Sequence, residues 1–267
     1  MSTTHHYKSN LRDVFFNLFE VNELSERTLS QPMFKHLDEA TCRQMLSEIY
    51  KLCETELATS YAADDREGLT FDGEGNVTLP QGLLAHMRTF REGGWPLLGL
   101  PEHMGGIGAP PSVAWAAIES TLGANPALTF YCFGNVIART IDILGTEEQK
   151  KRYVRPMIDG AWGGTMVLTE PDAGSDVGAG RTKARHVEGD VWEIEGVKRF
   201  ISQGDFNGTD NIVHLVLARP EGAGAGTKGL SMFIVPKFWV NEDGSLGERN
   251  GAFCTNIEDK MGLKSSA

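Results

Sequence analysis

The apolar residues of this chain follow two different spacings, one on each side of Gly160. Before Gly160 they recur every three or four positions, as at 45–57 and 83–90, which predicts amphipathic helices. The same pattern predicts helices at 112–122, 127–144 and 146–158. Thr146 and Gln149 form a capping-box pattern at the start of the last of these helices, and Gly160 lies just past its end.

After Gly160 the chain turns to short runs rich in Val, Leu and Ile. Gly, Pro and Asp bound these runs, which is typical of β-strands. Strands are expected at 182–188, 191–201, 212–218 and 230–235. The Gly189-Asp190 pair between the first two predicts a hairpin. Helices followed by a cluster of strands indicate an α+β fold whose first domain is all-α.

The changes of pattern divide the chain into three parts. We expect an N-terminal arm at 1–31, a helical domain at 32–160 and a strand-rich domain at 161–267. The arm contains a run of aromatic residues around Phe15 that is too dense for a disordered tail. We expect the arm to pack on the body of this chain, with docking on a neighbouring subunit as the alternative.

The composition narrows the class of function. The formal net charge of −11 argues against non-specific nucleic-acid binding. No stretch of about 20 uninterrupted apolar residues predicts a membrane span, and the N-terminus lacks a signal-peptide pattern. The four cysteines show no C-x-x-C spacing and the seven histidines no H-E-x-x-H motif, so we predict no metal site. A cytoplasmic protein with free thiols is expected.

Polar, glycine-bearing runs lie at the ends of two predicted strands. The first is Leu168-Thr169-Glu170-Pro171 followed by Ala173-Gly174-Ser175-Asp176, and the second is Phe200-Ile201-Ser202. Strand-end N–H groups can pair with ring carbonyls and nitrogens, and Gly lets a backbone approach a ligand closely. These features suit an aromatic, phosphate-bearing cofactor.

The first of these runs resembles the flavin-binding signature of acyl-CoA dehydrogenases. The second resembles the second flavin contact of that family, which is usually Trp-Ile-Thr, and residues 101–106 resemble its Pro-Glu-x-x-Gly-Gly loop. The arm and residues 237–262 are most similar to the large members, which include 3-methylmercaptopropionyl-CoA dehydrogenases. The resemblance implies a helical N-terminal domain and a β-barrel-like middle domain, incomplete here. The C-terminal four-helix domain of the family has no counterpart in this sequence.

The resemblance implies that the cofactor is FAD. The backbone of Met166 and Leu168, with the backbone and hydroxyl of Thr169, would then meet the pyrimidine side of the isoalloxazine. A donor there stabilises negative charge on the reduced ring. Gly174 and Ser175 would lie near the pyrophosphate, with Ser175 also close to the acyl-CoA.

The second motif would contact the other side of the flavin. Phe200 would pack against the ring, with Ile201 and Ser202 near its N5 edge. Phe200 replaces the more frequent Trp, and Ser202 the more frequent Thr, but each keeps the aromatic face or the hydroxyl. The acids inside the two motifs, Glu170 and Asp176, occupy turn-forming contexts, so we expect neither to act as a catalytic base.

The activity that the resemblance implies is FAD-dependent α,β-dehydrogenation of an acyl-CoA thioester, as in fatty-acid β-oxidation. An electron-transfer flavoprotein would accept the electrons, and the full-length protein would be a homo-oligomer. The family's base is a Glu of the C-terminal domain, so we expect no catalytic residue here and a truncated form with little or no activity. Two alternatives stay open: a non-catalytic flavoprotein-like binding or regulatory module, some of whose relatives bind DNA, and an acyl-CoA oxidase.

A second glycine-rich motif has two interpretations, a dinucleotide-binding site and a hairpin loop. Residues 224–229 match G-x-G-x-x-G, a pattern typical of dinucleotide sites when a helix follows it. The next run, 230–235, predicts a strand instead. We therefore interpret the motif as a hairpin loop.

Overall fold

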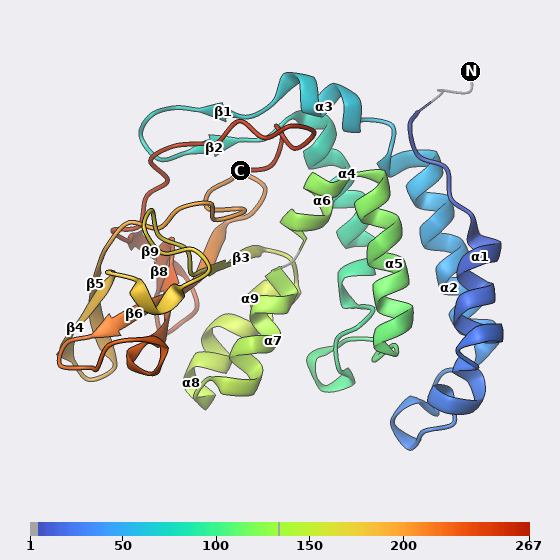
Figure 1. The fold of residues 1–267 in the computed structure, drawn as a ribbon, viewed down its shortest axis with the longest axis horizontal. Helices are drawn as coiled ribbons and strands as arrows, with labels where there is room; N and C mark the ends of the chain where they lie inside the picture. Colours follow the sequence, from blue (N-terminus) through green and yellow to red (C-terminus); the bar gives the residue numbers. More distant parts are fainter. Residues whose placement is uncertain (1–4, 133) are drawn as a thin grey trace. The chain divides into compact units, whose positions relative to one another are not determined.

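The computed structural model describes residues 5–132 and 134–267. The chain forms two compact units (Figure 1). The first comprises Met1–Leu69, Leu79–Asn135 and Asp259–Ser266, and the second comprises Thr70–Thr78, Val136–Glu258 and Ala267. Each unit is described by itself below.

The first unit is helical. Its helices are α1 (Leu11–Phe15), α2 (Glu39–Leu52), α3 (Tyr61–Glu67), α4 (Gln81–Glu92), α5 (Pro111–Ala124) and α6 (Pro126–Tyr131). The predicted apolar positions form its core, with Leu46, Leu83 and Met87 fully buried. The Asp38 carboxylate caps α2 by accepting a hydrogen bond of 2.7 Å from the Thr41 amide. Helical periodicity therefore located both the helices and their buried face.

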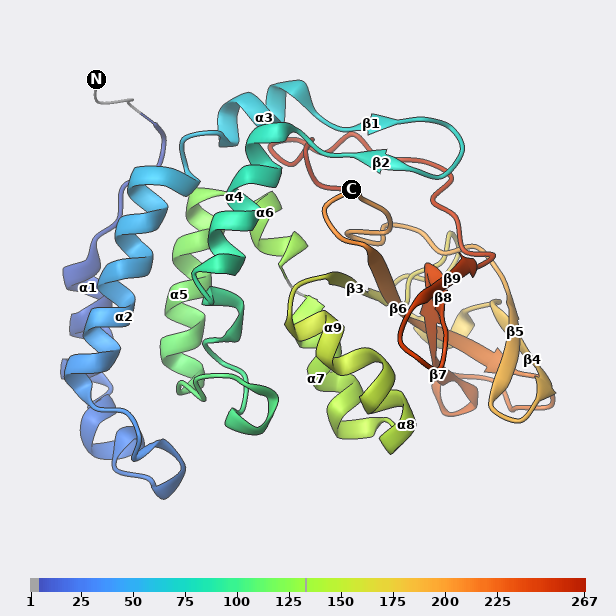
Figure 2. The same ribbon diagram turned by 180° about the vertical axis from the view of Figure 1, so that it is seen from behind.

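The N-terminal segment packs on α2, and Figures 1 and 2 show α1 lying alongside that helix. The Arg43 guanidinium of α2 lies over the rings of Phe15, at 4.7 Å, and Phe19, at 4.1 Å. Further along α2 and its extension, the Glu54 carboxylate accepts hydrogen bonds from the amide and hydroxyl of Ser9. Cation–π contacts and hydrogen bonds thus hold this segment on the helical body.

The α-helices α7 (Gly134–Leu144, from Val136 on), α8 (Glu147–Gln149) and α9 (Arg155–Ile158) belong to the second unit, with a wide turn between the last two. The capping box between Thr146 and Gln149 is present, as predicted. The single helix predicted at 127–144 runs across residue 133, which lies outside the described residues; on either side of it, α6 ends at Tyr131 and α7 begins at Gly134.

The stretch Pro126–Leu144 is long and apolar enough to cross a membrane by length and composition. However, 53% of it is buried inside the chain, as is also found for core helices of soluble proteins. The predicted lack of a membrane span therefore stays a prediction.

A mixed five-stranded sheet organises the second unit. Its strands are β3 (Trp162–Val167), β4 (Lys183–Glu188), β5 (Val191–Glu195), β6 (Asn211–Pro220) and β7 (Ser231–Pro236). The central strand β6 pairs in parallel with β3 and β4 and antiparallel with β7. The predicted β4–β5 hairpin is present. Helices followed by this sheet confirm the α+β prediction.

Two close contacts involve residues of strand β3. A Cβ on Gly164 would lie 2.7 Å from the Met157 side chain and 2.8 Å from that of Ile137, so a glycine lets these helical residues approach β3. Thr165 Oγ1 and His214 Nδ1 lie 2.7 Å apart on the neighbouring strands β3 and β6. Burial lowers the pKa of His214 to about 4, so the imidazole is neutral at pH 7.

The strand predicted at 191–201 is too long, because β5 ends at Glu195. Directly after it, Gly196 approaches Thr182 so closely that a Cβ would lie 2.3 Å from the threonine hydroxyl oxygen. Phe200 then has a φ of 60°, and Gln203 a φ of 64°. These left-handed conformations are incompatible with an extended strand.

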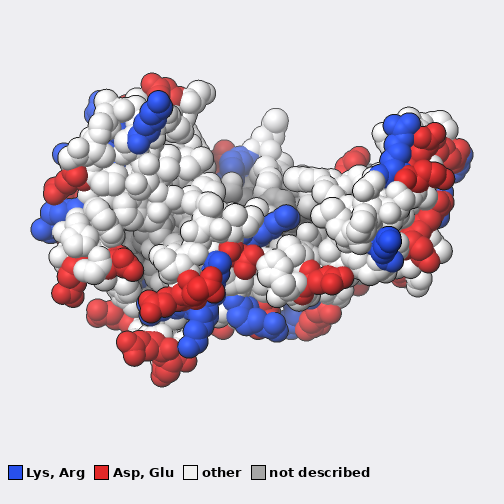
Figure 3. Space-filling model, turned by 90° about the horizontal axis from the view of Figure 1, so that it is seen from below, with Lys and Arg blue, Asp and Glu red and all other residues white. Residues whose placement is uncertain are grey.

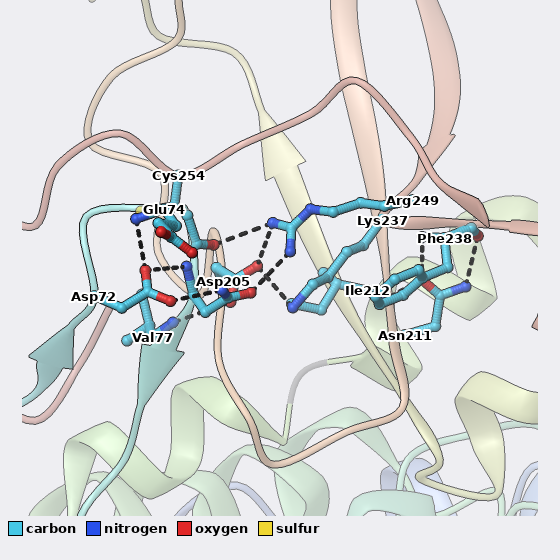
Figure 4. A network of polar contacts seen from close by, with 12 residues as sticks. Asp72, Glu74, Val77, Asp205, Asn211, Ile212, Lys237, Phe238, Arg249 and Cys254 are labelled. Carbon is cyan, nitrogen blue, oxygen red and sulfur yellow. Dashed lines mark hydrogen bonds and ion pairs between the residues drawn. The ribbon is translucent and has the colours of Figure 1, made fainter.

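A buried carboxylate connects the short hairpins to the body of the second unit (Figure 4). The hairpins are β1 (Thr70–Phe71) with β2 (Val77–Thr78), and β8 (Phe238–Val240) with β9 (Leu246–Arg249). Asp205 is 3% exposed and accepts a hydrogen bond of 3.2 Å from the Val77 amide. Its carboxylate also lies 2.8 Å from Lys237 Nζ and 3.6 Å from the Arg249 guanidinium.

We expect Asp205→Asn to lower the free energy of unfolding by about 3–5 kcal/mol, because Lys237 and Arg249 would lose a buried counter-charge. Urea denaturation measures this. Glu193→Gln is the control, since it breaks a pair with Arg185 whose side chains are more than half exposed, and it should cost at most about 1 kcal/mol. Equal losses in the two variants would contradict the structural role of Asp205.

Candidate functional site

The predicted site begins where β3 ends. Met166 and Leu168 are 41% and 36% exposed, whereas Val167 between them is buried. The Thr169 hydroxyl makes no hydrogen bond within residues 5–132 and 134–267. The end of β3 therefore presents two exposed apolar side chains, and an unpaired hydroxyl follows them in the sequence.

A closed turn carries the next part of the first motif. The Glu170 amide donates to the Ala173 carbonyl at 3.0 Å, and the Ala173 amide donates back at 3.1 Å. Gly174 follows, with no atom within 4 Å of the position of a Cβ. The exposed Ser175 hydroxyl has no hydrogen-bond partner among the described residues. Open backbone and an unpaired hydroxyl are compatible with an approaching phosphate.

The second motif lies in the irregular segment after β5. Phe200 is 68% exposed despite its size, and its left-handed φ costs on the order of 1–3 kcal/mol. The Arg199 guanidinium lies 5.0 Å from its ring centroid and 3.0 Å from the Glu258 carboxylate. Ile201 is half-buried, and the exposed Ser202 makes no side-chain hydrogen bond within the described part of the chain.

Hydrogen bonds bring the two motifs side by side. The Arg199 amide donates to the Thr169 carbonyl at 2.9 Å. Lys198 Nζ lies 3.0 Å from the Leu168 carbonyl, 2.7 Å from the Leu217 carbonyl and 2.9 Å from Glu170 Oε1. An ammonium has three N–H donors, so each has an acceptor. Residues 168–170 and 198–200 are therefore held together, although they are far apart in the sequence.

Glu170 is the buried partner in this arrangement, at 7% exposed. It accepts hydrogen bonds from the amides of Arg181, at 2.6 Å, and Thr182, at 3.1 Å, as well as from Lys198. Burial raises its pKa, but the hydrogen bonds from Thr182, Lys198 and Arg181 outweigh burial and lower the pKa to about 2. Both oxygens are occupied, so Glu170 is a structural anion and not a proton acceptor.

The structure thus brings together some of the residues that were predicted to bind the cofactor. Leu168, Thr169 and Phe200 belong to the two hydrogen-bonded segments, and Met166 lies directly before them on β3. Among the described residues, no hydrogen bond or ion pair joins Gly174 or Ser175 to residues 200–202.

Sequence reasoning assigned no role to Lys198. The available signal was a lysine two residues before the aromatic position, together with an acid inside the first motif.

The competing glycine motif has a different environment. Residues 224–229 connect the antiparallel strands β6 and β7, as the hairpin prediction required. Arg219 donates to the carbonyls of Gly224, Gly226 and Gly178. Since a strand and not a helix follows, this loop lacks the helix N-terminus of a dinucleotide site.

On the face in Figure 3, Lys and Arg lie among Asp and Glu, without a continuous basic surface over the described residues.

The sequence of this chain is similar to those of known proteins. The chain matches the acyl-CoA dehydrogenase N-terminal domain at 39–161 and the acyl-CoA dehydrogenase middle domain at 165–266. It is 51% identical, over 98% of its own length, to a broad-specificity linear acyl-CoA dehydrogenase of Mycobacterium tuberculosis, covering 43% of that protein. It is 35% identical to the 3-methylmercaptopropionyl-CoA dehydrogenase of Ruegeria pomeroyi, with 97% of this chain and 44% of the relative covered.

The fold is also found in a solved structure. Glutaryl-CoA dehydrogenase from Mycobacterium smegmatis, in complex with FADH2, matches with a TM-score of 0.59 and 23% identity. The match covers 78% of this chain and 49% of that one. The chain thus spans less than half the length of the curated relatives named above.

The Glu170 carboxylate predicts a pH-dependent stability. Its pKa is lowered from 4.5 to about 2 on folding, so its stabilising contribution is present above pH 4.5 and is lost as the pH falls from 4.5 towards 2. The shift corresponds to roughly 3 kcal/mol. Glu170→Gln should therefore unfold more easily than the wild type at pH 7, and the difference should shrink towards pH 3.

Chemical denaturation at the two pH values measures this difference. Glu258→Gln is the control, because the Glu258 side chain is 38% exposed and pairs with Arg199, the residue next to Lys198, and it should cost at most about 1 kcal/mol at pH 7. A Glu170→Gln deficit of the same size at pH 7 and pH 3 would show that the carboxylate is not a stabilising buried anion.

Proposed function

Because this chain belongs to the acyl-CoA dehydrogenase family, we propose that its second unit holds the isoalloxazine ring of FAD. The ring would lie against Met166, Leu168 and Thr169 on one side of the site and against residues 200–202 on the other. The observation that carries this proposal is the hydrogen-bonded alignment of the two motifs through Lys198 and Arg199.

The residues present fit such a ring. Met166, Leu168 and Phe200 expose apolar surface on the two segments that the Arg199 amide and Lys198 hold together, and flat aromatic ligands gain affinity from such surfaces. The hydroxyls of Thr169 and Ser202 are unpaired within the described residues and would bond the polar edge of the ring, with Ile201 beside Ser202. A strained, exposed Phe200 is also what a ligand contact would explain.

A separate part of the first motif is the candidate binding site for the phosphate end of the cofactor. Gly174 and Ser175 follow the closed turn and offer open backbone and an unpaired hydroxyl. We propose that they contact the pyrophosphate, with Ser175 also close to the acyl-CoA. Their position directly after the Glu170 turn would fix the distance between the ring end and the phosphate end of the cofactor.

For the whole protein we propose FAD-dependent α,β-dehydrogenation of an acyl-CoA thioester in fatty-acid oxidation. FAD would supply the hydride acceptor. A linear acyl-CoA is the first substrate to test, because the 51% identical relative is named for linear acyl-CoAs. We further propose an electron-transfer flavoprotein as electron acceptor, a homo-oligomeric assembly and a cytoplasmic location. We also propose that this chain consists of an N-terminal arm at 1–31, a helical domain at 32–160 and a strand-rich middle domain at 161–267.

No residue of this chain is proposed as the base that removes the α-proton. A general base needs a free carboxylate lone pair within reach of that proton. Glu170 is buried and accepts from Lys198 and two backbone amides. Its role is to hold the two motifs, not to accept a proton.

The visible absorption spectrum of the chain titrated with FAD tests the proposal. We expect a perturbed flavin band on binding, and about tenfold weaker binding for Phe200→Ala, which loses a stacking surface. Thr169→Val should weaken binding by several-fold, because it removes one hydrogen bond.

Phe253→Ala is the matched control, since Phe253 is also exposed and lies 4.8 Å from the Arg249 guanidinium. It should bind FAD as the wild type does. The proposal is wrong if the wild-type chain leaves the FAD spectrum unchanged, or if Phe253→Ala weakens binding as much as Phe200→Ala.

A further inference from the structure

The peptide between Leu168 and Thr169 has a defined direction. Its carbonyl oxygen accepts a hydrogen bond of 3.0 Å from Lys198 Nζ, whose side chain is 12% exposed. The structure contains no cis peptide bond among the residues it describes, and in a planar trans peptide the N–H points opposite to the C=O. The Thr169 N–H therefore points away from Lys198.

That N–H is also available. Within residues 5–132 and 134–267, the Thr169 amide donates to no acceptor, although the Thr169 carbonyl is occupied by the Arg199 amide. A peptide whose oxygen is bound to a cation is polarised, and hydrogen bonds along such a chain strengthen one another. The free N–H is consequently a stronger donor than an ordinary backbone amide.

The Lys198 ammonium, which polarises this peptide, is held in place by its three hydrogen-bond acceptors. The Lys198 side chain is 12% exposed and Glu170 7%, and the third acceptor, the Leu217 carbonyl, belongs to the central strand β6. Arg181 and Thr182 amides fix the other side of Glu170. Its three acceptors therefore fix Lys198 in place, and it acts on a ligand at the end of β3 through the peptide.

We propose that Lys198 is a positioning residue that biases the site towards the reduced flavin through the Leu168–Thr169 peptide. It turns the Thr169 N–H away from the ion pair and polarises it, so that the N–H favours a ligand whose pyrimidine side gains negative charge. This inference rests on the proposed function, because it requires FAD at the end of β3. It adds that a buried cation without flavin contact sets the relative affinity for the two redox forms.

The structure offers a matched control pair. Lys237 and Asp205 lie 2.8 Å apart with 12% and 4% of their side chains exposed, in the same unit. Neither forms a hydrogen bond with Leu168, Thr169 or residues 198–202 among the described contacts. Removing this pair removes an ion pair of similar exposure and leaves the polarised peptide intact, and it also takes from Arg249 the carboxylate that lies 3.6 Å away.

The experiment measures the midpoint potential of FAD bound to the chain, by equilibration with a redox dye, in matched neutral double variants. Lys198→Met/Glu170→Gln removes the polarising pair without leaving a lone buried charge, and Lys237→Met/Asp205→Asn is the control. The first should lower the ratio of reduced to oxidised FAD affinity about tenfold, which is about 30 mV for a two-electron couple. The control should leave the ratio unchanged, and Lys198→Arg, which keeps the charge, should recover most of it.

Hydrogen exchange gives a readout that needs no flavin. In Lys198→Met/Glu170→Gln, the Arg199 amide should exchange faster because its bond to the Thr169 carbonyl loosens, whereas the control should protect it as the wild type does. Unchanged protection of this amide, or equal redox shifts in both double variants, would overturn the inference. A wild-type chain that binds no FAD would overturn the proposed function, and the inference with it, which distinguishes the two failures.

Discussion

The buried ion pair between Lys198 and Glu170 is the interaction on which the candidate site depends. Removing two charges from water is costly, and a buried pair is stable only when its remaining donors and acceptors are satisfied. Here all three ammonium hydrogens have acceptors, and the carboxylate also receives two backbone amides. The pair therefore joins the end of β3, the start of β4, the central strand β6 and the segment after β5.

This arrangement explains why the segment after β5 is irregular. Lys198 must reach inward to its acceptors while Arg199 bonds Thr169 and faces Glu258. Phe200 is then left exposed with a left-handed φ, a conformation that a bulky residue adopts only when its surroundings impose it. The irregular backbone and the exposed aromatic are thus consequences of one buried charge pair and its fixed partners.

Much of the fold was predictable because it depends on local sequence. Apolar periodicity found α2, α4 and α5, Thr146 and Gln149 marked a helix start, and Gly189-Asp190 marked a hairpin. The errors arose where distant residues decide the backbone. β5 ends at Glu195, directly before the close approach of Gly196 to Thr182, and no local pattern indicates that approach.

The site shows the same division. Its two motifs were recognisable as sequence runs, and the open turn at Gly174 followed from composition. Their alignment was not predictable, because the bond between Lys198 and Glu170 joins residues 28 positions apart and depends on the sheet register. Local patterns specify which groups are present, whereas the register of β3, β4 and β6 decides which groups meet.

The most direct test of this account is the amide spectrum of the isotope-labelled chain, recorded by NMR with and without FAD. The account predicts that the Thr169 amide proton shifts downfield on binding, as a free donor that gains an acceptor, together with changes at Phe200 and Ser202. FAD binding that leaves Thr169 unshifted, and instead perturbs the glycine loop at 224–229, would contradict it.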